Sequence, residues 1–528
     1  MSHASHEILP GLYRFESKLA GPHQPVNSYV WRAGRKTIII DPAGDLTPAA
    51  LSEAGAGRIP DILVTHVQQE NIAGCANFPD ARIHVPAGDA YLCNGPEAYA
   101  KVIENWQPPW EWETRGNFTG NLAGAANERP CNTPLRLSTP LSAGEPCSGC
   151  TLIATPGHGK NALAIIAEIA GKRVAFCGDL VCGDGQLWNW FDSEWDYGLQ
   201  GGPQALLKSA AALLREKPDI LCPTHGPVLH DPQAALTRLQ RRLEAVLAPG
   251  PSHDAAAVNF PDTDSPAPGF RQILPHLHQY RAGNLNVLLS ATGNALVVDD
   301  GLCFWEPLPQ RTEHHRQVIT DMKRALDVRR IELAIPSHYH GDHTENIPEL
   351  TAIEGTQVAC VDDIADTIEC PERFGVTCLL PWYGSAYERF RVDRRLLNGQ
   401  RMRWHEYVLE VFMLGGQTWY THGISVRIDR VRTQFVGDSI GGFGTGCEPP
   451  LCYNDCEPST RGWAFAVDKM IEHKPDLLVC GHGIAIRDPM PMLAKKQAAW
   501  RQRMMEFDEL NFRGNRRLFF DPFLRNAE

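Results

Sequence analysis

The chain has 528 residues, of which 43% are hydrophobic, and a formal net charge of −12. An acidic protein gains no general electrostatic attraction to phosphate backbones, so nucleic acid is disfavoured as a partner. No apolar run is long enough to span a bilayer, and the first residues lack the basic start and apolar core of a secretory signal. We therefore expect a cytoplasmic protein with no membrane partner.

The length predicts two domains, because 528 residues exceed what one hydrophobic core usually serves. Around residues 248–268, Pro, Asp and Ser replace periodic apolar residues, as in a linker. We therefore expect a first domain at 1–247 and a second at 269–528, which ends in a basic helical tail. In both halves short apolar runs alternate with helical stretches such as 233–247, so periodicity predicts a mixed α/β fold.

In the first half, chemically active side chains follow strand-like apolar runs such as 38–40 and 62–64. In chain order they are Asp41, His66, His158, Asp179 and His225. Two histidines and one carboxylate form a recognised arrangement for non-haem iron. The first half therefore contains a candidate site for one metal ion.

In the second half, the segment 337–343 packs four potential metal ligands into six residues after the apolar run 331–336. Residues two apart in an extended chain face the same side, so His338, His340 and Asp342 can converge, while His343 points to a neighbouring position. Two adjacent metal ions could share this loop. Imidazoles with a carboxylate suit zinc, iron or manganese better than calcium or magnesium.

The order of motifs is the same in both halves, which indicates two whole domains and not a short-period solenoid. The segment 338–343 has the pattern HxHxDH, and Asp299, Asp438 and His482 each end or follow a further apolar run. This set resembles the signature of the metallo-β-lactamase superfamily. The resemblance implies two αββα sandwiches in tandem, with the metal loops at one sheet edge.

The resemblance also implies a ligand set for the second domain. It gives one metal position to His338, His340 and Asp438, and the other to Asp342, His343, His482 and Asp438. The family's remaining histidine is missing, because Gln417 stands in its segment. Either Gln417 offers a weaker amide oxygen, or His422 takes the role, or one metal position is poorly held.

The first domain departs further from the family, since Gln68, Glu70 and Asn71 replace three of the loop ligands. The remaining His66, His158 and Asp179 resemble the single-iron set of persulfide dioxygenases, and His225 matches the final histidine. The alternative is a decayed site that serves as a scaffold.

Function follows from the metal chemistry. Two close divalent ions lower the pKa of a shared water and stabilise an oxyanion, which predicts hydrolysis by the second domain. We expect zinc, most simply two ions there, although iron or manganese also fits, and Asp342 can orient the attacking water. The expected substrate is a small molecule with an ester, thioester, phosphoester or related bond.

Two alternatives remain open at this point: a protein that binds a ligand or partner without turnover, and an iron oxidoreductase in the first domain. Fold-level analogy also allows a homo-oligomer. Aromatic residues in 106–112, 187–195, 382–383 and 419–420 are expected to frame the pockets or to bury an interface.

Overall fold

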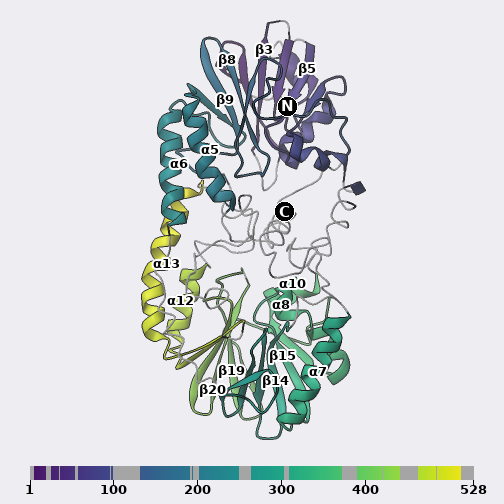
Figure 1. Ribbon diagram of the computed structural model, residues 1–528, viewed down its shortest axis with the longest axis vertical. Helices are drawn as coiled ribbons and strands as arrows, with labels where there is room; N and C mark the ends of the chain where they lie inside the picture. The colour runs from purple at the N-terminus through teal and green to yellow at the C-terminus, as the bar shows by residue number, and fades with distance from the viewer. Residues whose placement is uncertain are drawn as a thin grey trace. The chain divides into compact units, whose positions relative to one another are not determined.

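The computed structural model describes residues 5–19, 25–34, 36–53, 58–95, 97–98, 101, 131, 133–188, 190, 193, 201–248, 263–302, 309–370, 389–418, 420–440, 462–482 and 484–512. The chain forms two compact units (Figure 1). The first unit comprises Met1–Ala248 together with Glu506–Glu528, and the second comprises Pro249–Met505. The sequence placed the C-terminal residues in the second domain, whereas they group with the first unit. The predicted domain boundaries stay a prediction, since most of the linker lies outside the described residues.

The first unit contains two sheets. The first sheet has the strand order β1-β2-β3-β4-β5-β6. Its strands are β1 (Ser5–Leu9), β2 (Leu12–Glu16), β3 (Asn27–Ala33), β4 (Lys36–Ile40), β5 (Arg58–Leu63) and β6 (Arg82–His84). The second sheet has the order β10-β9-β8-β7. Its strands are β7 (Thr151–Ala154), β8 (Leu163–Ile169), β9 (Lys172–Gly178) and β10 (Ile220–Pro223).

Helices accompany both sheets of the first unit. They are α1 (Pro48–Glu53), α2 (Gln69–Ile72), the 3₁₀ helices η1 (Ala73–Asn77) and η2 (Ala87–Asn94), α5 (Gly201–Arg215) and α6 (Pro232–Leu247). The predicted helix at 233–247 is confirmed as α6. It begins where the Asp231 side chain accepts a hydrogen bond from the Ala234 backbone N–H, with Pro232 in the first turn.

The core of the first unit follows from strand alternation in β4. Ile38 and Ile40 face one side and pack between the two sheets with Phe176 of β9. Ile39 faces the other side and packs with Ile72 of α2. A strand buried on both faces must be apolar at every position, which explains the continuous isoleucine run. At about 25 cal/mol per Å² of buried apolar surface, such side chains stabilise the sandwich by roughly 2 kcal/mol each.

The second unit also has two sheets, with orders β11-β12-β13-β14-β15-β16-β17 and β18-β19-β20-β21-β22-β23. The first comprises β11 (Phe270–Leu274), β12 (Leu277–Tyr280), β13 (Leu285–Leu289), β14 (Asn294–Asp300), β15 (Arg330–Ile335), β16 (Gln357–Val361) and β17 (Arg394–Leu396). The second comprises β18 (Arg401–Trp404), β19 (Tyr407–Met413), β20 (His422–Ile428), β21 (Val431–Gly437), β22 (Leu477–Cys480) and β23 (Ala485–Arg487). Its helices are α7 (Gln310–Ala325), α8 (Gly341–Thr344), α9 (Ile347–Glu354), α10 (Asp362–Glu369), α12 (Trp463–Glu472) and α13 (Met490–Leu510), whose last residues belong to the first unit.

Strand directions repeat between the units. In each first sheet, four antiparallel strands are followed by parallel ones, from β4 to β6 and from β14 to β17. In each second sheet, antiparallel pairs are followed by a parallel pair, β9 with β10 and β21 with β22, and in the second unit β23 then pairs antiparallel with β22. The predicted mixed α/β class is thus confirmed, and an origin by duplication stays a prediction.

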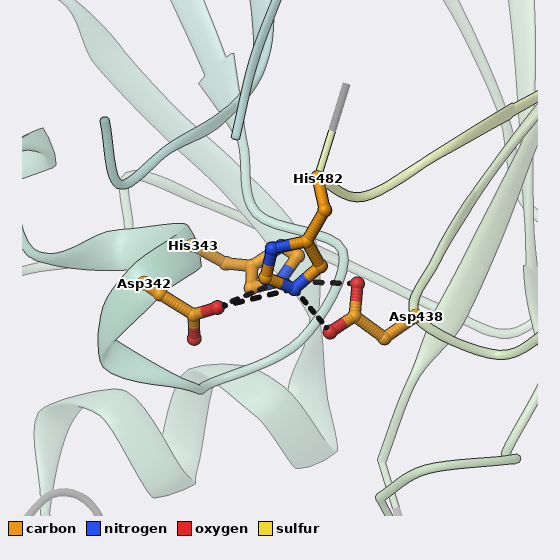
Figure 2. Close-up of side chains that lie close together, drawn as sticks. All are labelled: Asp342, His343, Asp438 and His482. Atoms are coloured by element: carbon orange, nitrogen blue, oxygen red, sulfur yellow. Dashed lines mark hydrogen bonds and ion pairs between the residues drawn. The ribbon is translucent and has the colours of Figure 1, made fainter. Parts of the chain in front are cut away.

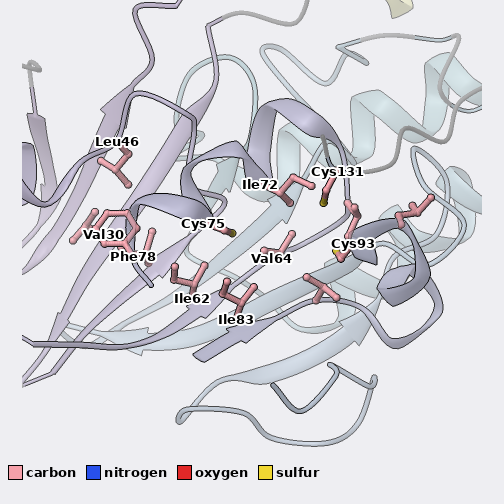
Figure 3. Close-up of a cluster of buried hydrophobic side chains, with 14 of the residues drawn as sticks. Val30, Leu46, Ile62, Val64, Ile72, Cys75, Phe78, Ile83, Cys93 and Cys131 are labelled. Atoms are coloured by element: carbon pink, nitrogen blue, oxygen red, sulfur yellow. The ribbon is translucent and has the colours of Figure 1, made fainter. Parts of the chain in front are cut away.

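Cysteines contribute to the apolar core of the first unit. Figure 3 shows Cys75, Cys93 and Cys131 among buried aliphatic side chains such as Val64 and Ile83. The described cysteines are free thiols, and burial raises the pKa of the Cys75 thiol well above its usual value. These cysteines therefore pack as small apolar residues. Among the described helices, none combines the length and the apolarity that a membrane crossing needs.

Candidate metal centres

The second unit gathers Asp342, His343, Asp438 and His482 into one cluster (Figure 2). Each offers one ligand atom, and these atoms all lie within 4.8 Å of one another. His482 Nε2 lies 3.0 Å from Asp438 Oδ2 and 3.4 Å from Asp342 Oδ2. His343 Nε2 lies 3.4 Å from Asp438 Oδ1 and 3.6 Å from Asp342 Oδ2. Two imidazoles and two carboxylates at these separations fit a divalent cation.

The ends of neighbouring strands position these four side chains. Asp342 and His343 lie in α8 after β15, Asp438 follows β21, and His482 follows β22. Strands β21 and β22 are parallel, so their carboxyl ends meet at one sheet edge. The close approach requires Gly481, because a Cβ atom there would collide with Asp438 Oδ1.

His338 and His340 lie beside this cluster. The ring centroid of His338 is 4.6 Å from that of His340 and 4.0 Å from that of His343. Within the described residues, His338 Nε2, Asp438 Oδ1 and Gln417 Oε1 are buried atoms that make no hydrogen bond. Buried polar atoms are almost always satisfied, so these three atoms are suited to bind a cation. The assignment of all seven residues as ligands stays a prediction.

Asp299 holds the loop at 337–343 in place through contacts with both of its ends. Its Oδ1 accepts a hydrogen bond from the Ser337 backbone N–H at 2.6 Å, and its Oδ2 lies 3.0 Å from His343 Nδ1. Ser337 Oγ lies 3.0 Å from His338 Nδ1. The His338 ring therefore has its Nδ1 anchored to the protein, which leaves its Nε2 for a cation. The sequence named Asp299 as a structural residue but did not identify Ser337.

Asn284 is a second residue that the sequence did not reveal. It precedes β13, and its Nδ2 lies 3.0 Å from His343 Nε2 and donates to the Asp342 backbone oxygen at 2.8 Å. Its Oδ1 accepts a hydrogen bond from the His482 backbone N–H. In the first unit, Asn27, the first residue of β3, donates to the backbone oxygens of Pro223 and Gly226 on either side of His225. The sequence signal that could have identified Asn284 is an asparagine at the corresponding position of each half, Asn27 and Asn284.

Burial and neighbouring charges act together on the pKa values of the cluster. Burial alone would lower the pKa of His343, but Asp438 and Asp299 raise it well above its ordinary value. Burial alone would raise the pKa of Asp438, yet His482 and His343 hold it well below its usual range. Burial and the adjacent His343 hold the pKa of His338 well below its ordinary value. His338 is therefore neutral, which is the form that binds a cation.

Between β19 and the first residue of β20, the geometry favours Gln417 over His422 as the candidate metal ligand. The His422 backbone N–H donates to the Ser337 oxygen at 2.9 Å, and in the first unit the Leu163 N–H donates to the Thr65 oxygen at 2.8 Å. His422 thus occupies the place of a core leucine at the start of the strand. Gln417 lies earlier, in the loop that corresponds to the one containing His158.

The first unit gathers His66, His158 and Asp179, whose ligand atoms also lie within 4.8 Å of one another. Asp179 Oδ2 is 3.5 Å from Nε2 of His66 and 3.5 Å from Nε2 of His158. All three side chains are buried. Burial lowers the pKa of His158 to about 4, so its ring is neutral at pH 7. Two neutral imidazoles and one carboxylate fit a single divalent ion.

In the first-unit loop, Asn71 stands where the second-unit loop has His343. Asn71 Nδ2 lies 3.4 Å from Asp41 Oδ1 and donates to the His66 backbone oxygen at 2.8 Å. Its Oδ1 accepts from the Gln68 backbone N–H at 3.0 Å. The amide therefore anchors the loop to Asp41, and its oxygen, a weaker ligand than imidazole, already accepts from the Gln68 N–H.

His225 lies next to the first-unit cluster and pairs with Asp179. Its Nδ1 is 2.8 Å from both carboxylate oxygens of Asp179. Burial alone would raise the pKa of Asp179, but His225 and His158 lower it. The four predicted first-domain residues are therefore neighbours, and His225 contacts the carboxylate through its Nδ1. Of the aromatic residues expected near the sites, Trp188, Trp190 and Tyr420 are described, and those at 106–112, at 382–383 and at position 419 lie outside the described residues.

No family model matches the sequence, and no curated protein matches it. A metallo-β-lactamase with a HARLDQ motif from Cronobacter sakazakii is 15% identical, with a TM-score of 0.33 over 45% of this chain and 89% of that chain. A metallo-β-lactamase family protein from Thermus thermophilus is 21% identical, with a TM-score of 0.32 over 46% and 83%. The metallo-β-lactamase GOB-18 from Elizabethkingia meningoseptica is 12% identical, with a TM-score of 0.33 over 48% and 93%. Each of these three solved structures is a metallo-β-lactamase or a member of that family.

Proposed function

We propose that the chain is a metal-dependent hydrolase and that the second unit carries the reaction. The observation that supports this most is the cluster of Asp342, His343, Asp438 and His482 within 4.8 Å, next to His338. A chain that only binds a partner has no need to bury these groups together, since buried charges are costly unless they are paired or bind a metal.

A divalent cation bound there would supply a water of lowered pKa and would stabilise an oxyanion. The protein residues have separate tasks around it. His343 and Asp438 are fully buried and fix the geometry, whereas Asp342 and His482 each expose 17% of the side chain. Asp342 is therefore the carboxylate that solvent and substrate can reach, and we assign it to orient the attacking water and to accept its proton.

The substrate that fits this chemistry is a small molecule with an ester, thioester, phosphoester or related bond. Zinc is our first choice of metal, with two ions in the second unit, because imidazoles and carboxylates supply the ligands. The net charge of −12 disfavours nucleic acid. The cytoplasmic location and a homo-oligomeric state stay predictions.

The test is metal content together with turnover in the full chain. A His338→Ala/His340→Ala double variant should lose most second-unit metal and should no longer cleave ester or phosphodiester reporters. His405→Ala is the matched control, because His405 pairs with Glu332 at 2.7 Å and is not a member of the cluster. Unchanged metal content in the double variant would contradict the proposal.

A second candidate function is supported by the first-unit group His66, His158 and Asp179. Two histidines and one carboxylate hold iron in many oxygen-using enzymes, so an oxidoreductase similar to persulfide dioxygenases is the alternative. Metal content separates the candidates. About two zinc equivalents favour the hydrolase, one iron equivalent dependent on His66 favours the oxidoreductase, and a chain that binds no metal points to a binding protein.

A further inference from the structure

We propose that Trp188 is a positioning residue for the first-unit cluster and that residues 510–512 near the C-terminus hold it in place. This inference rests on the proposed binding of one cation by His66, His158 and Asp179. It concerns residues that the metal motifs of the sequence do not include.

The first step is a flat stack between Trp188 and His225. Their ring centroids lie 4.5 Å apart with an interplanar angle of 10°. Both side chains are buried, at 7% and 1% exposure. Parallel stacking over this distance fixes the plane of the imidazole.

The second step links His225 to the cation ligands. His225 Nδ1 lies 2.8 Å from both oxygens of Asp179, and Asp179 Oδ2 faces His66 and His158 at 3.5 Å. A turn of the His225 ring would therefore turn the carboxylate that must bind the cation. Partners of metal ligands in this position typically change metal affinity by about 10- to 100-fold when they are removed.

The third step is that the C-terminal residues fix the backbone at Leu187. The Leu187 N–H donates to the Leu510 oxygen at 2.8 Å, and the Phe512 N–H donates to the Leu187 oxygen at 2.9 Å. Leu187 and Asn511 form a parallel β-bridge. The Gln186 side chain adds a hydrogen bond to the Asn511 oxygen at 3.1 Å. A segment more than 300 residues away in sequence thus positions Trp188.

The fourth step is that the turn before Trp188 accommodates Phe512. The Phe512 ring lies 5.6 Å from the Trp188 ring. Gly183 has a φ of +49°, and a Cβ atom there would lie 2.7 Å from Phe512 Cδ2. Any larger residue would push the phenyl ring away from the indole. Indole, imidazole and carboxylate therefore form one buried chain of contacts that begins at the C-terminal segment.

The test measures Co²⁺ binding to the full chain by competition with a chelator. The first-unit share is the part of the binding that a His66→Ala/His158→Ala variant loses. We expect Trp188→Leu to weaken that share by about 10- to 100-fold, and Phe512→Ala to weaken it by about 3- to 10-fold. Binding by the second unit should be unchanged in both variants.

Trp190→Leu is the matched control, because Trp190 lies in the same segment, is 3% exposed and packs on Phe507 at 4.9 Å. It removes an equally buried indole, and we expect the first-unit share to change by less than about threefold, well below the effect of removing a partner of a ligand. Equal weakening by Trp188→Leu and Trp190→Leu would overturn the positioning role and would indicate a general loss of stability.

A measurement on metal-free protein tests the positioning role of Trp188 separately from the proposed cation site. In the chelator-treated chain, diethyl pyrocarbonate should modify His225 several-fold faster in Trp188→Leu and Phe512→Ala than in the parent or in Trp190→Leu. If the parent binds no cation through His66 and His158, the first-unit metal site is wrong. If His225 reacts equally fast in the parent and in Trp188→Leu, the positioning role is wrong.

Discussion

The loops at 65–71 and 337–343 follow equivalent strands, β5 and β15. Each loop is hydrogen-bonded to an equivalent aspartate, Asp41 or Asp299, yet the two loops differ in what they can bind. Thr65 and Ser337 make matching contacts: each backbone N–H bonds to the aspartate, and each hydroxyl lies about 3 Å from Nδ1 of the next histidine. The seventh residue differs, since Asn71 reaches Asp41 as His343 reaches Asp299. The histidine directs its Nε2 toward Asp342 and Asp438, whereas the amide of Asn71 offers only an oxygen, a weaker ligand that already accepts from the Gln68 N–H.

The comparison shows that anchoring a loop and binding a metal are separable tasks. Asn71 preserves the anchor to the buried aspartate and so keeps the loop in shape. Asparagine in place of histidine therefore need not destabilise the fold. A decayed site and an altered single-metal site would both look like this, and the following experiments distinguish them.

The largest expected effect is that of Asp438→Ala compared with Asp179→Ala. Asp438 lies 3.0 Å from His482 Nε2 and 3.4 Å from His343 Nε2, so its removal takes away the carboxylate that lies closest to the Nε2 atoms of both imidazoles. We expect reporter hydrolysis to fall by at least about 10³-fold, in line with the loss of a metal ion's electrostatic stabilisation. Steady-state turnover of the full chain is the measurement.

Asp179→Ala serves as the paired control for that experiment. It should lower first-unit metal binding and leave reporter hydrolysis within a few-fold of the parent, provided that far-UV circular dichroism shows an intact fold. A comparable loss of turnover in Asp179→Ala would mean that both units contribute to the chemistry.

The next effect is a gain of metal binding by the first unit. The triple variant Gln68→His/Glu70→Asp/Asn71→His copies the second-unit loop ligands onto a loop with the same anchors. We expect about one additional zinc equivalent per chain, because the ligand count then matches that of the second unit. Atomic emission after gel filtration gives the number. Asn71→His alone should fold normally, and an unchanged zinc count in the triple variant would show that more than these ligands differs.

A smaller effect concerns two corresponding loops, the one between β19 and β20 that contains Gln417 and the one between β7 and β8 that contains His158. An amide oxygen is a weaker zinc ligand than a neutral imidazole. Gln417→His should therefore tighten metal binding by about 10-fold or more, and His158→Gln should loosen the first-unit ion to a similar degree. Chelator competition measures both. No tightening in Gln417→His would mean that Gln417 does not face the cation.

The strand-end motifs could be found in the sequence because their candidate ligands lie close together in sequence or follow apolar runs. The segment 338–343 and the isoleucine run of β4 are local signals of this kind. The sequence patterns did not identify Ser337 and Asn284, because serine and asparagine are common in loops. Only the fold brings these two residues into contact with His338 and His482. The contact between Trp188 and His225 depends on residues near the C-terminus, and no local pattern encodes such a long-range pairing.

His422 is the position where the sequence left two interpretations open, and it gives the last prediction. Its side chain is fully buried, and within the described residues neither ring nitrogen makes a hydrogen bond. The first unit has Leu163 at this place, and it packs between the sheets. An unsatisfied buried imidazole costs about 1–3 kcal/mol, so His422→Leu should stabilise the second unit by about 1 kcal/mol at pH 7.5 after the loss of shape complementarity is subtracted.

The pH dependence makes this prediction specific. Burial lowers the pKa of His422 to about 3 from the ordinary value of 6.5. Between these values the unfolded chain binds a proton that the folded chain does not, so the stability of the parent falls as the pH decreases below 6.5. The advantage of His422→Leu should therefore grow by about 2 kcal/mol from pH 7.5 to pH 5. Urea unfolding of chelator-treated protein at both pH values measures it, with Leu163→His expected to impose the same penalty on the first unit. A pH-independent difference would show that burial does not lower the pKa of His422. A loss of metal binding in His422→Leu would show that His422 is a ligand.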